Sequence, residues 1–259
     1  MSIEALPFVN WIFWAALTAG SLLVVGVTEV LGGTTRGYRL FMAWLLAACA
    51  AILLLSELNL APGTIADATA DSRRALIWVL AALALSYLAA SLLRLPRSGL
   101  AIVGGLIGVA ALVTLATAGG TLSAPLFAAQ LLLSTLALGA VWSGMWLGHW
   151  YLVTPKLSPA PLRRMMWLLL ASLALQALVF GVAMLAVSSG PLGGDIGWLT
   201  WLRVLVGIAL PMGITVLAYL ATRAASLQAS TGLLYIGLAF VMAGSIAAAS
   251  ITYLTGVPV

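Results

Sequence analysis

The chain has 259 residues, of which 64% are hydrophobic and only 7% are charged. A soluble fold carries about 25% charged residues, so this composition excludes a sizeable soluble domain. The formal net charge of +5 comes from basic residues that stand singly or in pairs between apolar runs. This placement indicates membrane topology and argues against a nucleic-acid partner.

Apolar runs bounded by charges, turns and prolines predict eight transmembrane helices, because about 20 apolar residues cross a bilayer. In chain order they cover Phe8–Leu31, Leu40–Ser56, Ala75–Leu93, Leu100–Ala118, Pro125–Val153, Met165–Val187, Trp198–Ala221 and Leu233–Leu254. Pro211 lies inside the seventh span, where its missing N–H predicts a kink. The expected fold class is therefore an all-α, polytopic membrane protein.

The basic residues predict the orientation of these spans. Most of them follow the odd-numbered spans: Arg36, Arg39, Arg94, Arg97, Lys156, Arg163, Arg164 and Arg223. The excess of Lys and Arg on cytoplasmic loops then places both termini outside the cytoplasm, in the inner (cytoplasmic) membrane of a cell. No basic residue precedes Arg36, so we expect the first span to be retained rather than cleaved as a signal peptide.

The chain also reads as two halves, residues 1–120 and 121–259, with four spans each. Arg39–Ala50 is similar to Arg163–Ala174, and Gly99–Ala111 is similar to Gly232–Gly244. An even number of spans per half gives both halves the same orientation, so the repeat would be parallel with its axis along the membrane normal. The alternative is that helices rich in Leu and Ala resemble one another by chance.

Two ionisable residues occupy comparable places in these halves. Glu29 precedes Arg36 by seven residues, and His149 precedes Lys156 by seven residues. Ionisable groups in spans are costly, and proton relays are built from them. We therefore consider Glu29 and His149 as candidate catalytic residues of a proton relay, both facing the seam between the halves. The alternatives are that Glu29 pairs with Arg36 or Arg39, and that His149 has a structural role.

His149 is the only histidine, so a haem held by two histidines of this chain is excluded. A haem b held by His149 and a methionine stays open, with Met42, Met165 or Met166 as the sulfur ligand. A hydrogen bond from the imidazole to a quinone carbonyl is a further alternative. Cys49, the one cysteine, excludes an all-cysteine zinc site and a self-contained iron–sulfur cluster, and no protein metal-ligand set is evident.

A second group of polar residues is expected at the outer ends of the spans. Arg203 interrupts the seventh apolar run, so it needs a partner, and Asp195 or Glu57 is the nearest candidate by predicted depth. These three residues could form an ion pair between the halves or the wall of an outer cofactor-binding pocket. Gln130 and Gln176 are expected to be packing amides between helices.

This layout resembles the integral membrane subunits of the polysulfide-reductase type, the NrfD-like family. The small-residue-rich segment FWAALTAGSLLVVGVTEVLGG (Phe13–Gly33) is similar to the opening helix of such proteins. The resemblance implies a subunit without its own redox cofactor, which binds a quinone and passes electrons to a partner's iron–sulfur or haem centre. It also implies partners among membrane and extracytoplasmic redox subunits.

The sequence therefore predicts a quinone-interacting or anchoring membrane subunit of a respiratory or photosynthetic electron-transfer complex. Its part in an oxidoreductase would be non-catalytic or quinone-reactive. Three alternatives stay open: a transporter of ions or small solutes, a structural membrane subunit, and a membrane protein that binds haem through its single histidine. Copurified partners, absorption spectra and quinone extraction would separate these classes.

Overall fold

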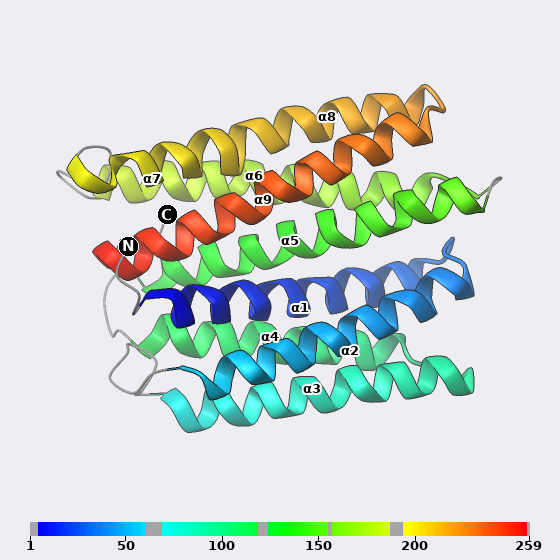
Figure 1. Ribbon diagram of the computed structural model, residues 1–259, viewed down its shortest axis with the longest axis horizontal. Coiled ribbons are helices and arrows are strands. Elements are labelled where there is room, and N and C mark those ends of the chain that lie inside the picture. Colours follow the sequence, from blue (N-terminus) through cyan, green and yellow to red (C-terminus); the bar gives the residue numbers. More distant parts are fainter. Residues whose placement is uncertain (1–4, 61–68, 119–123, 155–156, 187–193, 258–259) are drawn as a thin grey trace.

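The computed structural model describes residues 5–60, 69–118, 124–154, 157–186 and 194–257. Lys156, which contributed to the predicted orientation, lies outside these ranges. Among the described residues, eight helical segments are long and apolar enough to cross a membrane, which confirms the predicted fold class and number of spans. They lie side by side as a bundle (Figure 1).

The first four spans are single helices. They are α1 (Ala5–Leu31), α2 (Arg36–Leu58), α3 (Ala70–Leu93) and α4 (Ser98–Ala118). The second span is longer than its apolar run predicted, because the first turn of α2 includes Arg36 and Arg39. The side-chain hydroxyl of Thr35 caps this turn by accepting a hydrogen bond from the Tyr38 amide at 3.3 Å.

The remaining spans begin with α5 (Ala124–Val153) and α6 (Ala160–Ala186) and end with α9 (Leu227–Thr255). Between them, the seventh span consists of four consecutive segments. These are the short 3₁₀ turn η2 (Gly194–Ile196), α7 (Gly197–Trp201), the π-helix η3 (Leu202–Ala209) and α8 (Leu210–Arg223).

The π-helix lies just before Pro211, the residue expected to kink this span. Pro211 is the second residue of α8, and its ring cannot donate a hydrogen bond to the preceding turn. The amide of Leu210 instead bonds to the Leu205 carbonyl, five residues back. Proline is thus accommodated by a widened turn upstream of it, a feature that often marks functional positions in helices.

Helices α1 and α5 lie in the centre of the bundle, between the other helices (Figure 1). The contacts of the first half have counterparts in the second: α1 packs on α2 and α4, and α5 packs on α6 and α9. Across the centre, α4 packs on α5 and α9 packs on α1. This pattern is the one that two parallel halves related by an axis between α1 and α5 would produce. Whether the sequence repeat is genuine stays a prediction.

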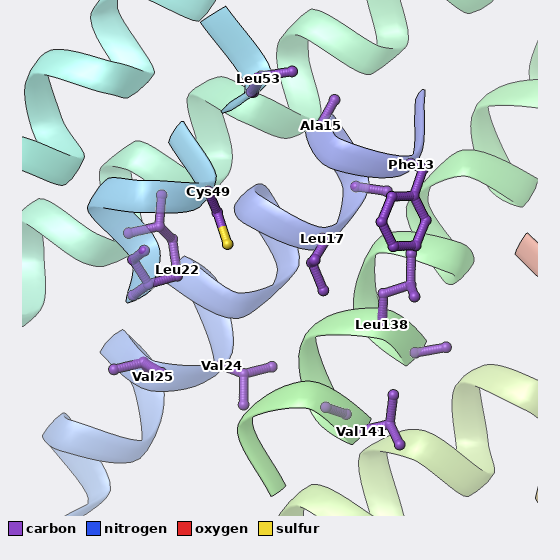
Figure 2. Packing of buried hydrophobic residues seen from close by; sticks show 14 of the residues in the cluster. Phe13, Ala15, Leu17, Leu22, Val24, Val25, Cys49, Leu53, Leu138 and Val141 are labelled. Carbon is purple, nitrogen blue, oxygen red and sulfur yellow. The ribbon is translucent and has the colours of Figure 1, made fainter. Parts of the chain in front are cut away.

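The core lies along this central contact. Leu17 and Val24 of α1 face Leu138 and Val141 of α5, and Cys49 of α2 points toward α1 (Figure 2). Many large apolar side chains on the outside of the bundle are exposed, including Trp78, Trp167 and Leu185. An exposed apolar surface of this extent fits contact with lipid rather than water.

The ends of the bundle differ in charge. We call the end that carries the connections after α1, α3, α5 and α8 the basic end, because Arg36, Arg94 and Arg223 lie there. Helix α1 begins and α9 ends at the opposite end (Figure 1). The described structure does not place either end relative to a cell, so the predicted outer location of the termini stays a prediction.

Candidate functional site

A buried ion pair joins α2 and α3 at the opposite end. Nε and Nη2 of Arg73 donate hydrogen bonds to the two carboxylate oxygens of Glu57 at 3.1 and 3.0 Å. The guanidinium carbon of Arg73 lies 5.5 Å from the ring centre of Trp11, a cation–π distance. Glu57 is only 2% exposed and is thus engaged within the first half.

Arg203 has a different partner from the one that the sequence analysis predicted. Its Nη2 donates a hydrogen bond of 2.6 Å to the side-chain carbonyl of Gln176 on α6, and the Gln176 amide donates to the Leu133 carbonyl of α5 at 3.1 Å. The prediction that Arg203 pairs with Asp195 or Glu57 is therefore wrong. Glu57 is bound by Arg73, and Asp195 lies exposed in η2.

The prediction failed because apolar-run lengths do not give relative depth. Arg203 is the second residue of the π-helix, where it is 1% exposed. This position brings it beside Gln176, an amide that the sequence analysis treated as packing. A neutral amide can satisfy one donor of a guanidinium, but it does not neutralise the charge.

Glu29 lies in a second charged cluster, at the basic end of the first half. Its Oε1 is 3.2 Å from Nη1 of Arg39 and 3.0 Å from Nη2 of Arg97, and its Oε2 accepts a hydrogen bond from the Tyr87 hydroxyl at 3.3 Å. The alternative in which Glu29 pairs with Arg39 is thus correct. The carboxylate also ties α1 to α3 and to the start of α4, which the sequence did not reveal.

The structure does not bring His149 and Glu29 together. His149 is an exposed residue of α5, and its Nδ1 lies 3.4 Å from the Tyr235 hydroxyl of α9. Glu29 faces α2 and α3, so each side chain contacts its own half rather than a shared seam. Their role as a proton relay stays a prediction, but a direct transfer between them is not what this geometry provides.

The residues considered for haem ligation lie in different environments. Met42, Met165 and Met166 are buried in the core, whereas His149 is exposed. Among the described residues, no group of three or more His, Cys, Asp or Glu side chains is placed to hold a metal ion. Gln130 of α5 is buried and donates to the Ser134 hydroxyl of the same helix at 3.2 Å, so its hydrogen bond does not join two helices as expected.

A groove of about 400 Å³ opens between α1, α5 and α6, in the part of the bundle toward the basic end. Its wall on α1 includes Leu23, Val27 and Leu31, which span about 12 Å at 1.5 Å per residue. Helix α6 contributes Arg164, Met165 and Leu168, and α5 contributes Leu136. Ligand pockets typically have volumes of 300–1,000 Å³ and mainly apolar walls.

The opposite seam, between α2 and α5, is filled by aromatic rings. Trp146 packs on Phe41 with ring centres 4.9 Å apart, and Trp150 packs on Phe41 at 6.3 Å. Gly37 of α2 leaves space for the Trp150 ring, because a Cβ there would overlap with it.

The two seams differ because of residues at matching positions. Gly20 of α1 and Gly139 of α5 meet at the centre of the bundle, which sets an offset of 119 residues between the helices. With this offset, Trp142, Trp146 and Trp150 of α5 correspond to Leu23, Val27 and Leu31 of α1, the residues of the groove wall. Smaller aliphatic side chains thus leave open the space that tryptophans fill on the other side.

Two polar groups lie in the groove near the basic end. Arg164 is exposed in the first turn of α6, and it takes part in none of the ion pairs formed by the described residues. The Thr28 hydroxyl donates to the Val24 carbonyl at 2.6 Å, which leaves its oxygen free to accept. The groove therefore combines apolar walls with a hydrogen-bond donor and an acceptor at one end.

Sequence reasoning missed this groove because Leu23, Val27 and Leu31 follow the i, i+4, i+8 spacing of an ordinary packed helix face. The signal that could have revealed it is the tryptophan stripe at the same spacing in α5. Comparison with known proteins adds no assignment: no protein family, curated protein or solved structure matches the chain.

Proposed function

We propose that the protein is a quinone-binding membrane subunit of an electron-transfer complex, and that the groove between α1, α5 and α6 holds the quinone. The observation that carries this proposal is the pairing of an apolar groove with Arg164 and Thr28 at its basic end. A quinone has the complementary form, since an isoprenoid tail is apolar and the ring carries two carbonyl oxygens.

The polar groups fit both redox states of such a ligand. The guanidinium of Arg164 would donate a hydrogen bond to a quinone carbonyl, and it retains its charge under all physiological conditions. The free lone pairs of Thr28 would accept a hydrogen bond from a quinol hydroxyl. Reduction adds two electrons and two protons to the quinone. We assign the electrons to a redox centre of a partner subunit and the protons to water at the basic end.

The cellular setting belongs to the same proposal. The Lys and Arg bias supports an inner-membrane location with both termini extracytoplasmic, which would place the basic end and the groove opening on the cytoplasmic side. The paired charges of Glu57, Arg73 and Glu29 are engaged in internal bonds. Redox partner subunits would then dock on surfaces other than these clusters.

A substitution that fills the groove tests the proposal directly. Val27→Trp places in α1 the side chain that α5 carries at the matching position, Trp146. We expect this variant, reconstituted in nanodiscs, to lose labelling by a photoreactive azidoquinone that competes with unmodified quinone. Val79→Trp on α3 is the control, because Val79 is 47% exposed and Val27 is 45% exposed.

The native complex provides the second arm of the test. Purification from native membranes should yield redox-active partners and quinone-dependent electron transfer. Specific labelling that survives Val27→Trp would move the quinone to another site. A preparation with neither a redox partner nor specific labelling would contradict the proposal and favour the transporter alternative.

A further inference from the structure

A second pocket, of about 430 Å³, lies at the basic end of the second half. It is formed where Leu157 and Pro159, which precede α6, meet the turn between α8 and α9. Arg163 of α6 and Arg223 of α8 both line it, together with the apolar side chains of Leu157, Pro159 and Leu227. Two arginine side chains thus line the same pocket.

These two arginines have no counterion in the described part of the chain. None of the ion pairs found there involves Arg163 or Arg223. Like charges that face one pocket repel each other, and the repulsion is relieved when an anion lies between them. A pocket of this kind is therefore more stable with an anion bound.

Two helix N-termini reinforce the positive potential. Helix α6 begins at Ala160, next to the pocket residue Pro159, and α9 begins at Leu227, which lines the pocket. The residue before α9, Ser226, makes no side-chain capping bond, so the first amides of α9 lack a side-chain acceptor. At the start of α6 the Ala160 amide donates to the Ser158 hydroxyl at 3.3 Å, so the free amides are those of α9. These amides and the helix dipole favour an anion at this position.

The first half shows how the chain neutralises the same arrangement. Arg39, which corresponds to Arg163 in the sequence repeat, binds Glu29 together with Arg97. The position that corresponds to Glu29 at the offset of 119 residues is Gly148. A Cβ at Gly148 would lie 2.7 Å from the hydroxyl oxygen of Thr231. The second half therefore retains Arg163, the counterpart of Arg39, and has no carboxylate at the position that corresponds to Glu29.

We propose that the pocket between Arg163 and Arg223 binds a phosphate group, which supplies to Arg163 the negative charge that Glu29 supplies to Arg39 in the first half. Arginine and free helix amides are the groups that recognise phosphate oxygens. The phosphate could belong to the headgroup of an anionic phospholipid or to a soluble phosphate ester. This inference does not depend on quinone binding in the groove, because the two sites share no lining residue.

The test measures ligand-dependent stability of the purified full-length protein in neutral detergent at constant ionic strength. The probes are phosphatidylglycerol, zwitterionic phosphatidylcholine and inorganic phosphate. We expect phosphatidylglycerol to raise the melting temperature and phosphatidylcholine to have no effect. In the variant Arg163→Gln/Arg223→Gln, the apparent affinity for the anionic probe that stabilises the wild type, phosphatidylglycerol or inorganic phosphate, should fall at least about tenfold.

Two further variants separate the site from general effects of charge and folding. Arg36→Gln is the matched control, because Arg36 is an exposed arginine in the first turn of α2 at the same end. It should bind as the wild type does. Leu227→Glu places a carboxylate at the pocket and at the start of α9, so it should fold stably and lose at least about tenfold in affinity for the same probe.

The outcomes distinguish the sources of the phosphate. A shift with phosphatidylglycerol alone would identify a lipid headgroup, whereas an equal shift with inorganic phosphate would identify a soluble ligand. The proposal is wrong if neither probe stabilises the protein. It is also wrong if Arg36→Gln loses as much affinity for the probe as the Arg163→Gln/Arg223→Gln variant does, or if Leu227→Glu binds the probe as tightly as the wild type.

Discussion

Gly20 of α1 and Gly139 of α5 lie against each other where the two central helices cross. A Cβ on Gly139 would overlap with the backbone of Gly20, and a Cβ on Gly20 would overlap with the Thr135 carbonyl. Small residues at such a crossing let two helices in lipid approach closely, and van der Waals packing then holds them together. This contact joins the two halves of the bundle.

We expect Gly139→Ala to destabilise the protein by about 1–3 kcal/mol, because the added methyl group has no space and the helices must separate. The free energy of unfolding can be measured by denaturing-detergent titration in mixed micelles. Modification of Cys49, which is buried and is the only cysteine, reports the exposure of the core.

Gly181→Ala in α6 is the control for helix propensity, since nothing lies within 4 Å of a Cβ at that position. Alanine is the better helix former, so this variant should be as stable as the wild type or slightly more so. Equal stability of both variants would show that the central helices can separate without cost.

The spans could be predicted from the sequence because a bilayer imposes a strong length and polarity requirement on each helix. Helix ends at charged residues were less well predicted. Arg36 and Arg39 belong to α2 although they lie outside its apolar run, since a helix can continue into the interface with its charged side chains in water. The π-helix before Pro211 also has no simple sequence signal beyond the proline itself.

The pair of Glu57 and Arg73 should be among the strongest polar contributions to stability. Glu57 accepts two hydrogen bonds from the buried Arg73 guanidinium. Removal of one partner from a buried ion pair is strongly destabilising, so we expect Glu57→Leu to cost about 3–5 kcal/mol. Glu57→Gln should cost less, because an amide can still accept from the guanidinium, as Gln176 does for Arg203. Unfolding titrations of the two variants would establish this order.

Asp195→Asn is the control for these variants. Asp195 is exposed in η2, so its substitution should change the free energy of unfolding by no more than about 0.5 kcal/mol. A large loss in Asp195→Asn would revive the pairing of Asp195 with Arg203 that the sequence analysis predicted.

Arg203 and Gln176 provide a test based on the order of two costs. Gln176→Leu removes the observed hydrogen bond to the buried guanidinium, and we expect a cost of at least about 3 kcal/mol, because a buried charged group left unsatisfied costs more than a neutral one. Arg203→Leu leaves only a neutral amide without its partner, which should cost about 1–3 kcal/mol. The double variant should be more stable than Gln176→Leu alone, and a double-mutant cycle measures this coupling.

The polar residues that carry these predictions could be identified from sequence, but their partners could not. Glu29, Glu57 and Arg203 were recognised because charge inside an apolar run is rare. Pairing depends on helix rotation and on relative depth, and a one-residue change turns a side chain by about 100° around the helix. For this reason Arg73, rather than Arg203, binds Glu57, and Glu29 and His149 face different neighbours.

Glu29 and His149 allow the relay hypothesis to be compared with a structural role. Because Glu29 is the counterion of the buried Arg97 and the half-buried Arg39, we expect Glu29→Gln to lower the free energy of unfolding by about 1–3 kcal/mol. This loss is smaller than the one expected for Glu57→Leu, because water screens the charge of the half-buried Arg39. His149→Phe should change the free energy of unfolding by no more than about 0.5 kcal/mol, because His149 is exposed and its contact with Tyr235 is long.

A proton relay predicts a different result: quinone-dependent turnover would fall in both variants while Glu29→Gln stayed as stable as the wild type. Parallel measurements of turnover and unfolding in the reconstituted complex decide between the two, since a structural Glu29 lowers activity only to the extent that it lowers the folded fraction.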